Sequence, residues 1–310
     1  MPAPIDVIKS KFITSIFQKY VEGKDIRHFR KKISYYFIFR IFRNFLKNDI
    51  ILKIYNFKVF GSIIKNKTSY FLLKKCEFGD YHELSTIKKF SNKNKLLFID
   101  CGCNYGFYSF YTASLSEKNL ILSIEASKDT SDEFIKNLNL NFFKNINFFN
   151  NAVSNTTNEN IPFFESVNDW ESSQTHNNFN FVSELKVKSI KIDSLLKQYS
   201  LNDYNVIIKL DVEGNEINVI KGALEVIKKS EPLIIIEFSK YIFENKDNID
   251  YLNNFLNEYD YSIYDTNYKK KNLEDILKML KNLQKRYKTI GNFYLIKNSS
   301  KNLKAFLSDE

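Results

Sequence analysis

The stretch LLFIDCGCNYGFYSFYTASL, residues 96–115, decides the fold. It begins with a short apolar run, passes through a loop that contains Gly102 and Gly106, and ends with apolar residues at helical spacing. This order predicts a buried strand, a tight turn and a helix. Such a loop places backbone N–H groups and a helix N-terminus at the mouth of a crevice. The two glycines alone fit a strand-to-helix turn without a ligand equally well.

The rest of the chain continues this alternation of strands and helices. Strands are predicted at residues 120–127, 146–154, 232–239, 261–266 and 292–298, and a strand, a loop and a helix at residues 206–229. Helices are predicted at residues 130–141 and 249–259, and a solvated basic helix at residues 268–288. This alternation is typical of a mostly parallel sheet with helices on both faces. We therefore expect an α/β fold whose ligand binds beyond the carboxyl ends of the strands.

Composition limits the class of protein. The chain has 310 residues, 44% of them hydrophobic, which is enough for one principal domain with an extension. Its three cysteines, Cys76, Cys101 and Cys103, indicate neither a disulfide framework nor a zinc site, and fit a reducing cytoplasm. We recognise no signal peptide and no apolar run of membrane-spanning length. The net charge of +10 favours anionic partners.

The residues around the glycine loop narrow the choice of ligand. A dinucleotide fingerprint would need glycine at the positions of Asn104 and Phe107, so a nicotinamide or flavin dinucleotide is disfavoured. Asp100, at the end of the first strand, could contact an ammonium group. Glu125, at the end of the second strand, is placed to accept hydrogen bonds from a ribose diol. An amine-bearing nucleoside without phosphates, such as S-adenosylmethionine, satisfies both acids.

Six motifs resemble those of the FkbM family of S-adenosylmethionine-dependent methyltransferases. They are FIDCGCNYGFYS, LSIEAS, NNAVSN, VKSIKIDSLL, IIKLDVEGNEINVIKGA and PLIIIEFS, in the order and approximate spacing of the family. KLDVEGNE followed by VIKGA is the most specific of them. Cys103 stands where the family usually has alanine, and EAS replaces the usual acid with a following proline. The resemblance implies a class I methyltransferase fold, which is Rossmann-like with a mostly parallel sheet.

The resemblance also implies where the cofactor binds. Its amino acid end would be held by the first strand and the glycine loop, through Asp100, Gly102, Asn104 and Gly106. The ribose would bind Glu125, and the adenine would lie near Asn151 or Ala152.

The motif IIKLDVEGNE carries the candidate catalytic residues. Asp211 is the first choice for a base that removes a proton from an acceptor hydroxyl, with Lys209 stabilising its charge. His176 is the rival base, although an idle surface histidine is the simpler interpretation. Each residue of the motif also has a structural alternative. Lys209 could be a buried partner of Asp211, and Glu213 and Glu216 could favour a helix N-terminus.

Other polar residues complete the candidate acceptor site. Trp170, Ser173 and His176 lie in a polar segment that resembles a lid or acceptor loop. Glu213 and Glu237 are further candidates for binding the substrate. Together with Asp211 they leave room for a hard divalent ion, which nothing in the sequence establishes. Asp193, before a short helix, is adequately explained as a cap.

We expect four segments along the chain. Residues 1–48 form a basic, aromatic-rich helical extension, residues 49–92 lead-in strands and a helix, residues 93–300 the methyltransferase domain, and residues 301–310 a tail. A helix at residues 27–47 would pack on the domain or on a second copy in a homo-oligomer, or lie on the inner membrane face. Nucleic acid ranks last as a partner, because no recognisable nucleic-acid module accompanies the charge.

Together these observations predict a cytoplasmic O-methyltransferase. Its acceptor, by the family resemblance, is a hydroxyl of a small molecule or a nucleotide-linked sugar, for a bacterial surface polysaccharide or glycoconjugate. The alternatives are a methyltransferase that acts on RNA or protein, and a non-catalytic membrane-associated or scaffold protein that keeps the fold.

Overall fold

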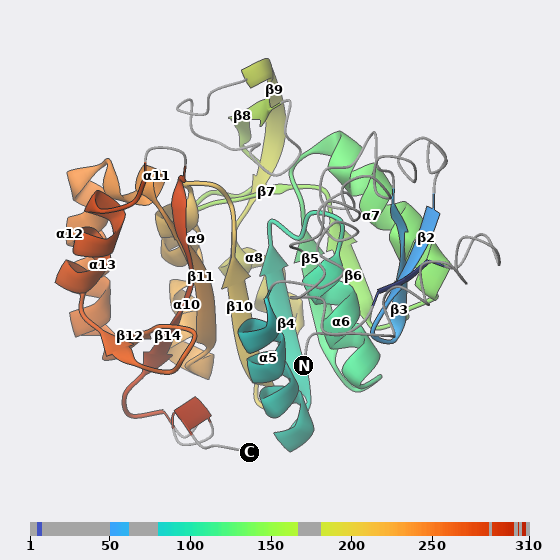
Figure 1. The fold of residues 1–310 in the computed structure, drawn as a ribbon, viewed down its shortest axis with the longest axis horizontal. Coiled ribbons are helices and arrows are strands. Elements are labelled where there is room, and N and C mark those ends of the chain that lie inside the picture. The colour runs from blue at the N-terminus through green and yellow to red at the C-terminus, as the bar shows by residue number, and fades with distance from the viewer. Residues whose placement is uncertain are drawn as a thin grey trace, which may run out of the picture. The chain divides into compact units, whose positions relative to one another are not determined.

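The computed structural model describes residues 5–7, 50–61, 80–166, 181–284, 287–300, 303 and 306–307 (Figure 1). The chain divides into two compact units, Met1–Tyr81 with Glu133–Phe142, and His82–Asp132 with Phe143–Glu310. No helix among the described residues is both long enough and apolar enough to cross a membrane.

The first unit contains a three-stranded antiparallel sheet in the order β1-β2-β3. Its strands are β1 (Ile5–Val7), β2 (Ile50–Ile54) and β3 (Phe57–Gly61). The side chains of Asn141 and Asn137 accept the N–H groups of Lys58 and Phe60 at 2.6 and 2.7 Å. The prediction of a helical extension is wrong for the three residues of β1. The helix predicted at residues 27–47 lies outside the described residues.

The second unit is built on an eight-stranded sheet in the order β13-β12-β14-β11-β10-β4-β5-β6. Its strands are β4 (Leu96–Cys101), β5 (Leu120–Ile124), β6 (Ile146–Phe149), β10 (Asn205–Leu210), β11 (Leu233–Ser239), β12 (Tyr261–Tyr264), β13 (Lys270–Lys271) and β14 (Thr289–Lys297). The neighbours β11, β10, β4, β5 and β6 are parallel, whereas β14 is antiparallel to both β11 and β12. The predicted α/β fold with a mostly parallel sheet is confirmed.

Helices follow the strands. They are α5 (Tyr81–Lys93), α6 (Phe107–Leu115), α7 (Lys128–Asn141), α8 (Ile192–Leu195), α9 (Glu216–Lys221), α10 (Leu224–Ser230), α11 (Lys240–Phe243), α12 (Lys246–Glu258) and α13 (Leu273–Lys281).

The sheet buries different side chains on its two faces, because successive residues of a strand point in opposite directions. Ile99, Ile208 and Ile236 belong to one buried cluster with residues of α8, α9, α10, α12 and α13. On the other face, α6 contacts Asp100 through Ser109, and α5 contacts Tyr294 through Thr86. Asp100 therefore faces α6, away from this buried apolar cluster.

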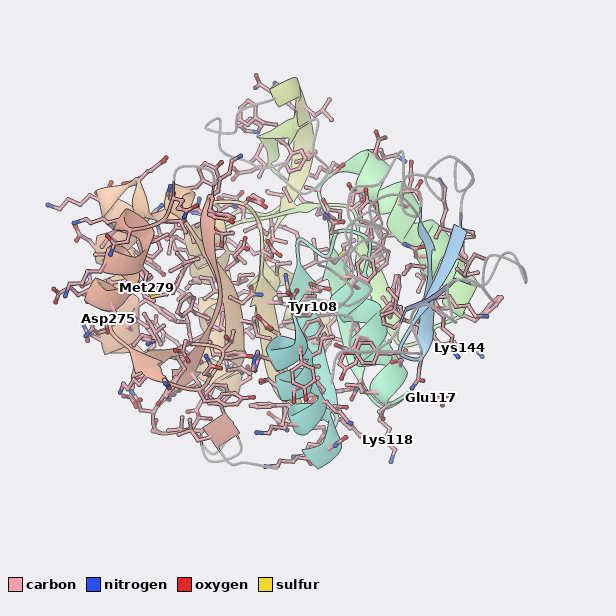
Figure 2. All side chains as sticks on the ribbon, in the orientation of Figure 1. Tyr108, Glu117, Lys118, Lys144, Asp275 and Met279 are labelled. Atoms are coloured by element: carbon pink, nitrogen blue, oxygen red, sulfur yellow. The ribbon has the colours of Figure 1, made fainter. Side chains whose placement is uncertain are left out.

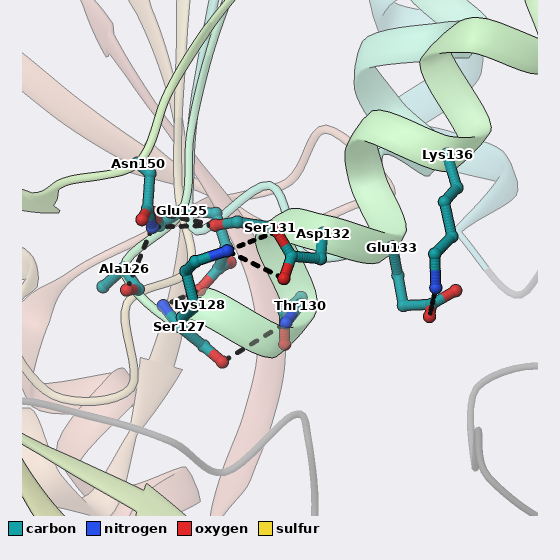
Figure 3. Close-up of polar contacts among 10 residues, drawn as sticks. All are labelled: Glu125, Ala126, Ser127, Lys128, Thr130, Ser131, Asp132, Glu133, Lys136 and Asn150. Atoms are coloured by element: carbon teal, nitrogen blue, oxygen red, sulfur yellow. Dashed lines mark hydrogen bonds and ion pairs between the residues drawn. The ribbon is translucent and has the colours of Figure 1, made fainter.

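The strand predicted at residues 146–154 is two strands in separate sheets. After β6 the chain leaves the central sheet, and β7 (Ala152–Val153) pairs with β9 (Phe181–Ile190), which also pairs with β8 (Asn160–Ser166). The break falls at Asn150, whose side-chain amide donates to the carbonyl oxygens of Glu125 and Ala126 (Figure 3). In Figure 1 the β8–β9 hairpin projects on the side to which β4 and β10 point.

The helix predicted within residues 206–229 is also divided. α9 ends before Gly222, where an added Cβ would lie 2.2 Å from the carbonyl oxygen of Ser154. α10 then begins, and the carboxylate of Asp193 accepts the N–H groups of Glu225 and Val226 at 3.1 and 3.0 Å. Asp193 is thus a cap, but of α10 rather than of the short helix α8 in which it lies.

The predicted solvated helix at residues 268–288 is shorter and partly buried. It begins at a capping box between Asn272 and Asp275, and Ile276 and Leu280 are only 0% and 6% exposed. Asp275 and Met279 of this helix are labelled in Figure 2. α13 is therefore amphipathic, and its apolar side belongs to the core.

Candidate active site

A row of three buried polar residues crosses the middle of the central sheet. In the register of the strands, Asp100 of β4 lies opposite Ser123 of β5 on one side and opposite Lys209 of β10 on the other. Asp100, Ser123 and Lys209 are 1%, 0% and 3% exposed. From α6, Ser109 donates to Asp100 Oδ2 at 2.6 Å and shares a hydrogen bond with Ser123 at 2.7 Å. Because polar groups are costly to bury, this row marks a site rather than ordinary core.

Asp100 retains one unused acceptor. Its Oδ1 is buried and has no hydrogen-bond partner among the described residues. Burial raises the pKa of this carboxyl, while the positive charge of Lys209 and the hydrogen bond from Ser109 oppose that rise. An unpartnered buried oxygen costs free energy that an ammonium group would recover, so Asp100 fits the amino acid end of S-adenosylmethionine.

The glycine loop after β4 uses its backbone donors internally. Gly102, Asn104 and Gly106 have positive φ angles of 77°, 50° and 90°, which wind the loop tightly. Each N–H from residue 102 to residue 106 donates within the protein: Gly102 and Cys103 to Ile124 O, Asn104 to Glu125 Oε2, Tyr105 to Asn104 Oδ1, and Gly106 to Cys103 O. A phosphate would have to displace these bonds. The loop therefore fits a nucleoside without phosphates better than a dinucleotide.

Gly102 also brings two loops into contact. A Cβ at this position would lie 1.9 Å from the carbonyl oxygen of Asp211, on the loop after β10. The backbone N–H of Asp211 donates to Cys101 O at 3.1 Å. The loops after β4 and β10, which carry the predicted cofactor and catalytic residues, thus touch through their backbones.

Glu125 is fixed at the end of β5. Its two carboxylate oxygens accept the N–H groups of Asn104 and Ser127 at 3.0 and 2.9 Å. Burial raises the pKa of Glu125, and these two hydrogen bonds oppose the rise. A carboxylate has about four acceptor positions, so the described bonds leave room for ribose hydroxyls. The backbone carbonyl of the same residue accepts the amide of Asn150 (Figure 3).

The residues predicted near the adenine lie where the chain enters the second sheet. Asn151 donates its side-chain amide to Lys188 O at 3.1 Å, and Ala152 pairs with Ser189 in β9. Their contact with the adenine stays a prediction.

Lys209 is held between a carboxylate and an aromatic ring. Its Nζ lies 2.7 Å from Asp211 Oδ2 and 4.6 Å from the ring centroid of Tyr108, which is labelled in Figure 2. The Lys209 side chain is 4% exposed, whereas that of Asp211 is 36% exposed. The fixed cation therefore supports a carboxylate that solvent, and an acceptor, can reach.

Three carboxylates gather where β10 and β11 end, two on the loop after β10 and one, Glu237, in the last residues of β11. Each of Asp211, Glu213 and Glu237 has an oxygen within 4.8 Å of the others. Burial, followed by the negative charge of Asp211, raises the pKa of Glu237 to about 8. Such a group could hydrogen-bond several hydroxyls or share a divalent ion. The structure thus brings together the residues that the sequence placed at the acceptor and metal site.

Glu216 belongs to the candidate catalytic motif, and its contact with the loop before it is the part of the site that sequence reasoning missed. Its carboxylate, on a residue 1% exposed, accepts the N–H of Val212 at 3.1 Å and the N–H of Gly214 at 3.0 and 3.2 Å. Burial raises the pKa of Glu216 to about 7. A glutamate two residues after a glycine, at the end of a strand and the start of a helix, is the signal that could have indicated this contact.

The remaining candidates lie outside the described residues. Trp170, Ser173 and His176 fall between residues 166 and 181, so their place relative to Asp211 stays a prediction.

The parallel sheet, the glycine loop after β4 and the acids that end β4 and β5 define the Rossmann-like class I methyltransferases. A family model described as "Methyltransferase FkbM domain" matches residues 100–263. The chain belongs to the FkbM family of methyltransferases. S-adenosylmethionine is therefore the cofactor that its site has to fit.

Solved structures of methyltransferases are similar to this chain at low sequence identity. A methyltransferase FkbM from Methylobacillus flagellatus KT is 17% identical, with a TM-score of 0.40 over 74% of this chain. The match spans 54% of that protein, about half its length. M. jannaschii TYW2, solved in complex with AdoMet, is 13% identical, with a TM-score of 0.40 over 81% of this chain and 84% of that one. A putative rRNA methylase from Clostridium thermocellum is 12% identical, with a TM-score of 0.40 over 70% of this chain and 93% of that one. No curated protein matches the chain.

Proposed function

We propose that this protein is an S-adenosylmethionine-dependent O-methyltransferase that acts on a hydroxyl of a sugar, in the synthesis of a bacterial surface polysaccharide or glycoconjugate. Membership of the FkbM family supports methyl transfer. The observation that carries the proposal is the ion pair between Lys209 and Asp211, whose charged atoms lie 2.7 Å apart. Lys209 also lies opposite Asp100, the residue proposed to bind the cofactor, on the neighbouring strand.

The cofactor supplies an electrophilic methyl group when it is bound. Asp100 would accept a hydrogen bond from its ammonium group through Oδ1, and Glu125 would accept the ribose hydroxyls through its remaining acceptor positions. The glycine loop, whose described N–H groups are already bonded, would contribute shape rather than donors.

Asp211 would act as the base for the acceptor. A sugar hydroxyl is a weak nucleophile, and a carboxylate that takes its proton as the new bond forms contributes roughly 10²–10⁴ in rate. Lys209 Nζ, 2.7 Å from Asp211 Oδ2, holds this carboxylate in place, and the other carboxylate oxygen would take the proton. Alignment of the hydroxyl with the methyl group would supply much of the remaining rate.

The charge of the acceptor site supports a neutral acceptor. Asp211, Glu213 and Glu237 lie together, and the described cation beside them, Lys209, is only 4% exposed. A phosphate or carboxylate next to the reacting hydroxyl would meet no exposed cation among these residues, whereas several hydroxyls would be hydrogen-bonded. In a nucleotide-linked sugar, the phosphates would therefore lie away from this cluster.

The test is turnover of Asp211→Asn on a panel of neutral sugars, uronic acids and sugar nucleotides. We expect the parent to release S-adenosylhomocysteine with a neutral sugar or its nucleotide. Asp211→Asn should lose roughly 10²–10⁴ in kcat, because the amide cannot take the proton. It should bind S-adenosylhomocysteine as tightly as the parent in calorimetry. The matched control is Asp203→Asn, at an exposed aspartate.

Three results would count against the proposal. Turnover of Asp211→Asn within a few-fold of the parent would remove Asp211 as the base. A larger loss in His176→Ala would move that role to the polar segment. Turnover on RNA or a protein but on no sugar would overturn the acceptor class. A separate measurement with a chelator tests the metal, because loss of turnover would show that a divalent ion takes part.

A further inference from the structure

We propose that Glu216 is a positioning residue, which holds the loop between β10 and α9 in the shape that presents Asp211 to the acceptor. This inference rests on the proposed function, because it assigns Glu216 a role through Asp211.

The carboxylate of Glu216 binds the backbone of the loop that precedes it. The carboxylate follows Asp211 by five positions, yet it accepts the N–H groups of Val212 and Gly214, the residues on either side of Glu213. One side chain thereby fixes two peptide groups that the helix α9 does not reach. The orientation of the residues between them follows from these bonds.

The loop needs such a support because its backbone is strained. Glu213 has φ of 52°, a left-handed conformation that costs a residue with a side chain free energy, and Gly214 follows with φ of 105°. Strained residues persist only where the surroundings over-determine them. Here the surroundings are the carboxylate of Glu216, the Lys209–Asp211 ion pair and the close approach of Gly102.

The burial of Glu216 separates this role from a general helix effect. An acid stabilises a helix N-terminus from an exposed position, as Glu225 can in the first turn of α10 with a side chain 65% exposed. Glu216 is 1% exposed, and its ionised form is disfavoured by that burial. A helix alone does not require a carboxylate at such a buried place.

The first experiment measures the loop directly. The N–H of Gly214 lies 3.2 and 3.0 Å from the two carboxylate oxygens of Glu216, so in Glu216→Gln the new NH₂ donor faces this N–H donor in either orientation of the amide, and only one acceptor oxygen remains. Amide exchange in residues 212–214 should then become at least tenfold faster, with little change in β4. Glu225→Gln, the same substitution in an exposed first turn, is the control and should leave this exchange unchanged. Equal exchange in Glu216→Gln and the parent would overturn the proposal.

The second experiment tests whether this positioning reaches the chemistry. In the panel of neutral sugars, Glu216→Gln should lower kcat about 10- to 100-fold, while its affinity for S-adenosylhomocysteine stays within about twofold. In the Asp211→Asn background the same substitution should cost at most twofold, because its effect passes through Asp211. Equal costs in both backgrounds would show a merely structural role and overturn the proposal.

The two proposals fail differently. If Asp211→Asn alone leaves turnover unchanged, the proposed base is wrong, and amide exchange still decides whether Glu216 holds the loop. If Glu216→Gln does not fold, Glu216→Asp replaces it, since it keeps the charge but shortens the reach. It should show the same faster exchange at residues 212–214. Slow exchange in a folded Glu216→Asp would contradict the contact.

Discussion

Replacing Gly102 by alanine tests the contact between the loops after β4 and β10. The new Cβ would lie 1.9 Å from the carbonyl oxygen of Asp211, where a real Cβ stays about 3 Å or more away. The carbonyl must therefore move by about 1 Å, and φ of +77° adds strain for a residue with a side chain. The clash acts on the loop that carries Asp211, whereas the strain acts on the glycine loop after β4.

Two other glycines separate these contributions. Gly291 has φ of +94° with nothing within 4 Å of its Cβ position, so Gly291→Ala should cost only the strain, about 1–2 kcal/mol. At Gly222 the backbone does not lie in this region, but a Cβ would meet Ser154 O at 2.2 Å, so Gly222→Ala should cost an overpacking penalty of about 1–3 kcal/mol. Gly102→Ala combines both, at about 2–5 kcal/mol. That is a large share of the about 5–15 kcal/mol of a typical domain.

Urea denaturation of the three variants and the parent provides the free energies of unfolding. Each of the three substitutions lowers the conformational entropy of the unfolded chain by the same amount, because each replaces a glycine by alanine. This contribution therefore cancels when the variants are compared. We expect Gly102→Ala to be the least stable. If it is no less stable than Gly291→Ala, the two loops do not approach as closely as described, and the argument that Gly102 serves this contact is wrong.

Three further outcomes are expected. Glu125→Ala should weaken the binding of S-adenosylhomocysteine by about 1–3 kcal/mol in calorimetry, with Glu117→Ala as an exposed control, and unchanged affinity would remove Glu125 from the ribose. Glu216 and Glu237 have pKa values raised from 4.5 to about 7 and about 8, so the folded protein binds protons more tightly than the unfolded chain between these limits. Their stabilisation is present below about pH 4.5 and is lost as the pH rises to 8. The free energy of unfolding should therefore be lower at pH 8 than at pH 5 by up to about 6 kcal/mol, and the fall should be smaller in Glu237→Gln. An equal fall in that variant would contradict the assignment. Asp193→Ala should cost about 0.5–2 kcal/mol in urea denaturation, because it uncaps α10, whereas a loss of turnover without a loss of stability would give Asp193 another role.

Much of the fold could be predicted because the apolar runs of the sequence are the strands that the structure buries. β4, β5, β10, β11, β12 and β14 are apolar runs of ordinary strand length, and each lies within one or a few residues of its predicted place. The site followed from the same logic, since parallel strands bring their carboxyl ends to one edge. Asp211 and Glu237, from strands that are neighbours in the sheet, accordingly lie within 4.8 Å of each other.

The remaining features depend on contacts between distant segments. The strand at residues 146–154 divides because the amide of Asn150 bonds to carbonyls 24 and 25 positions earlier, and α10 begins where Asp193, 32 positions earlier, caps it. Neither partner can be identified from a local window. The role of Glu216 is local in sequence but depends on a positive φ at Glu213, which composition does not predict for a glutamate.

The position of β14 has a consequence for how the chain reaches its folded state. β14 is the last strand along the described sequence, yet it lies between β11 and β12, and pairs with residues 233–239 and 261–264. Until residues 289–297 have been synthesised, β12 has no neighbour on its β11 side and the apolar strand LIIIEFS exposes an open edge. An open apolar edge is a template for pairing with another chain. A nascent or truncated chain that stops before Thr289 should therefore aggregate through β11. By pairing with β11, β14 covers the edge at which a second copy of the chain could otherwise add.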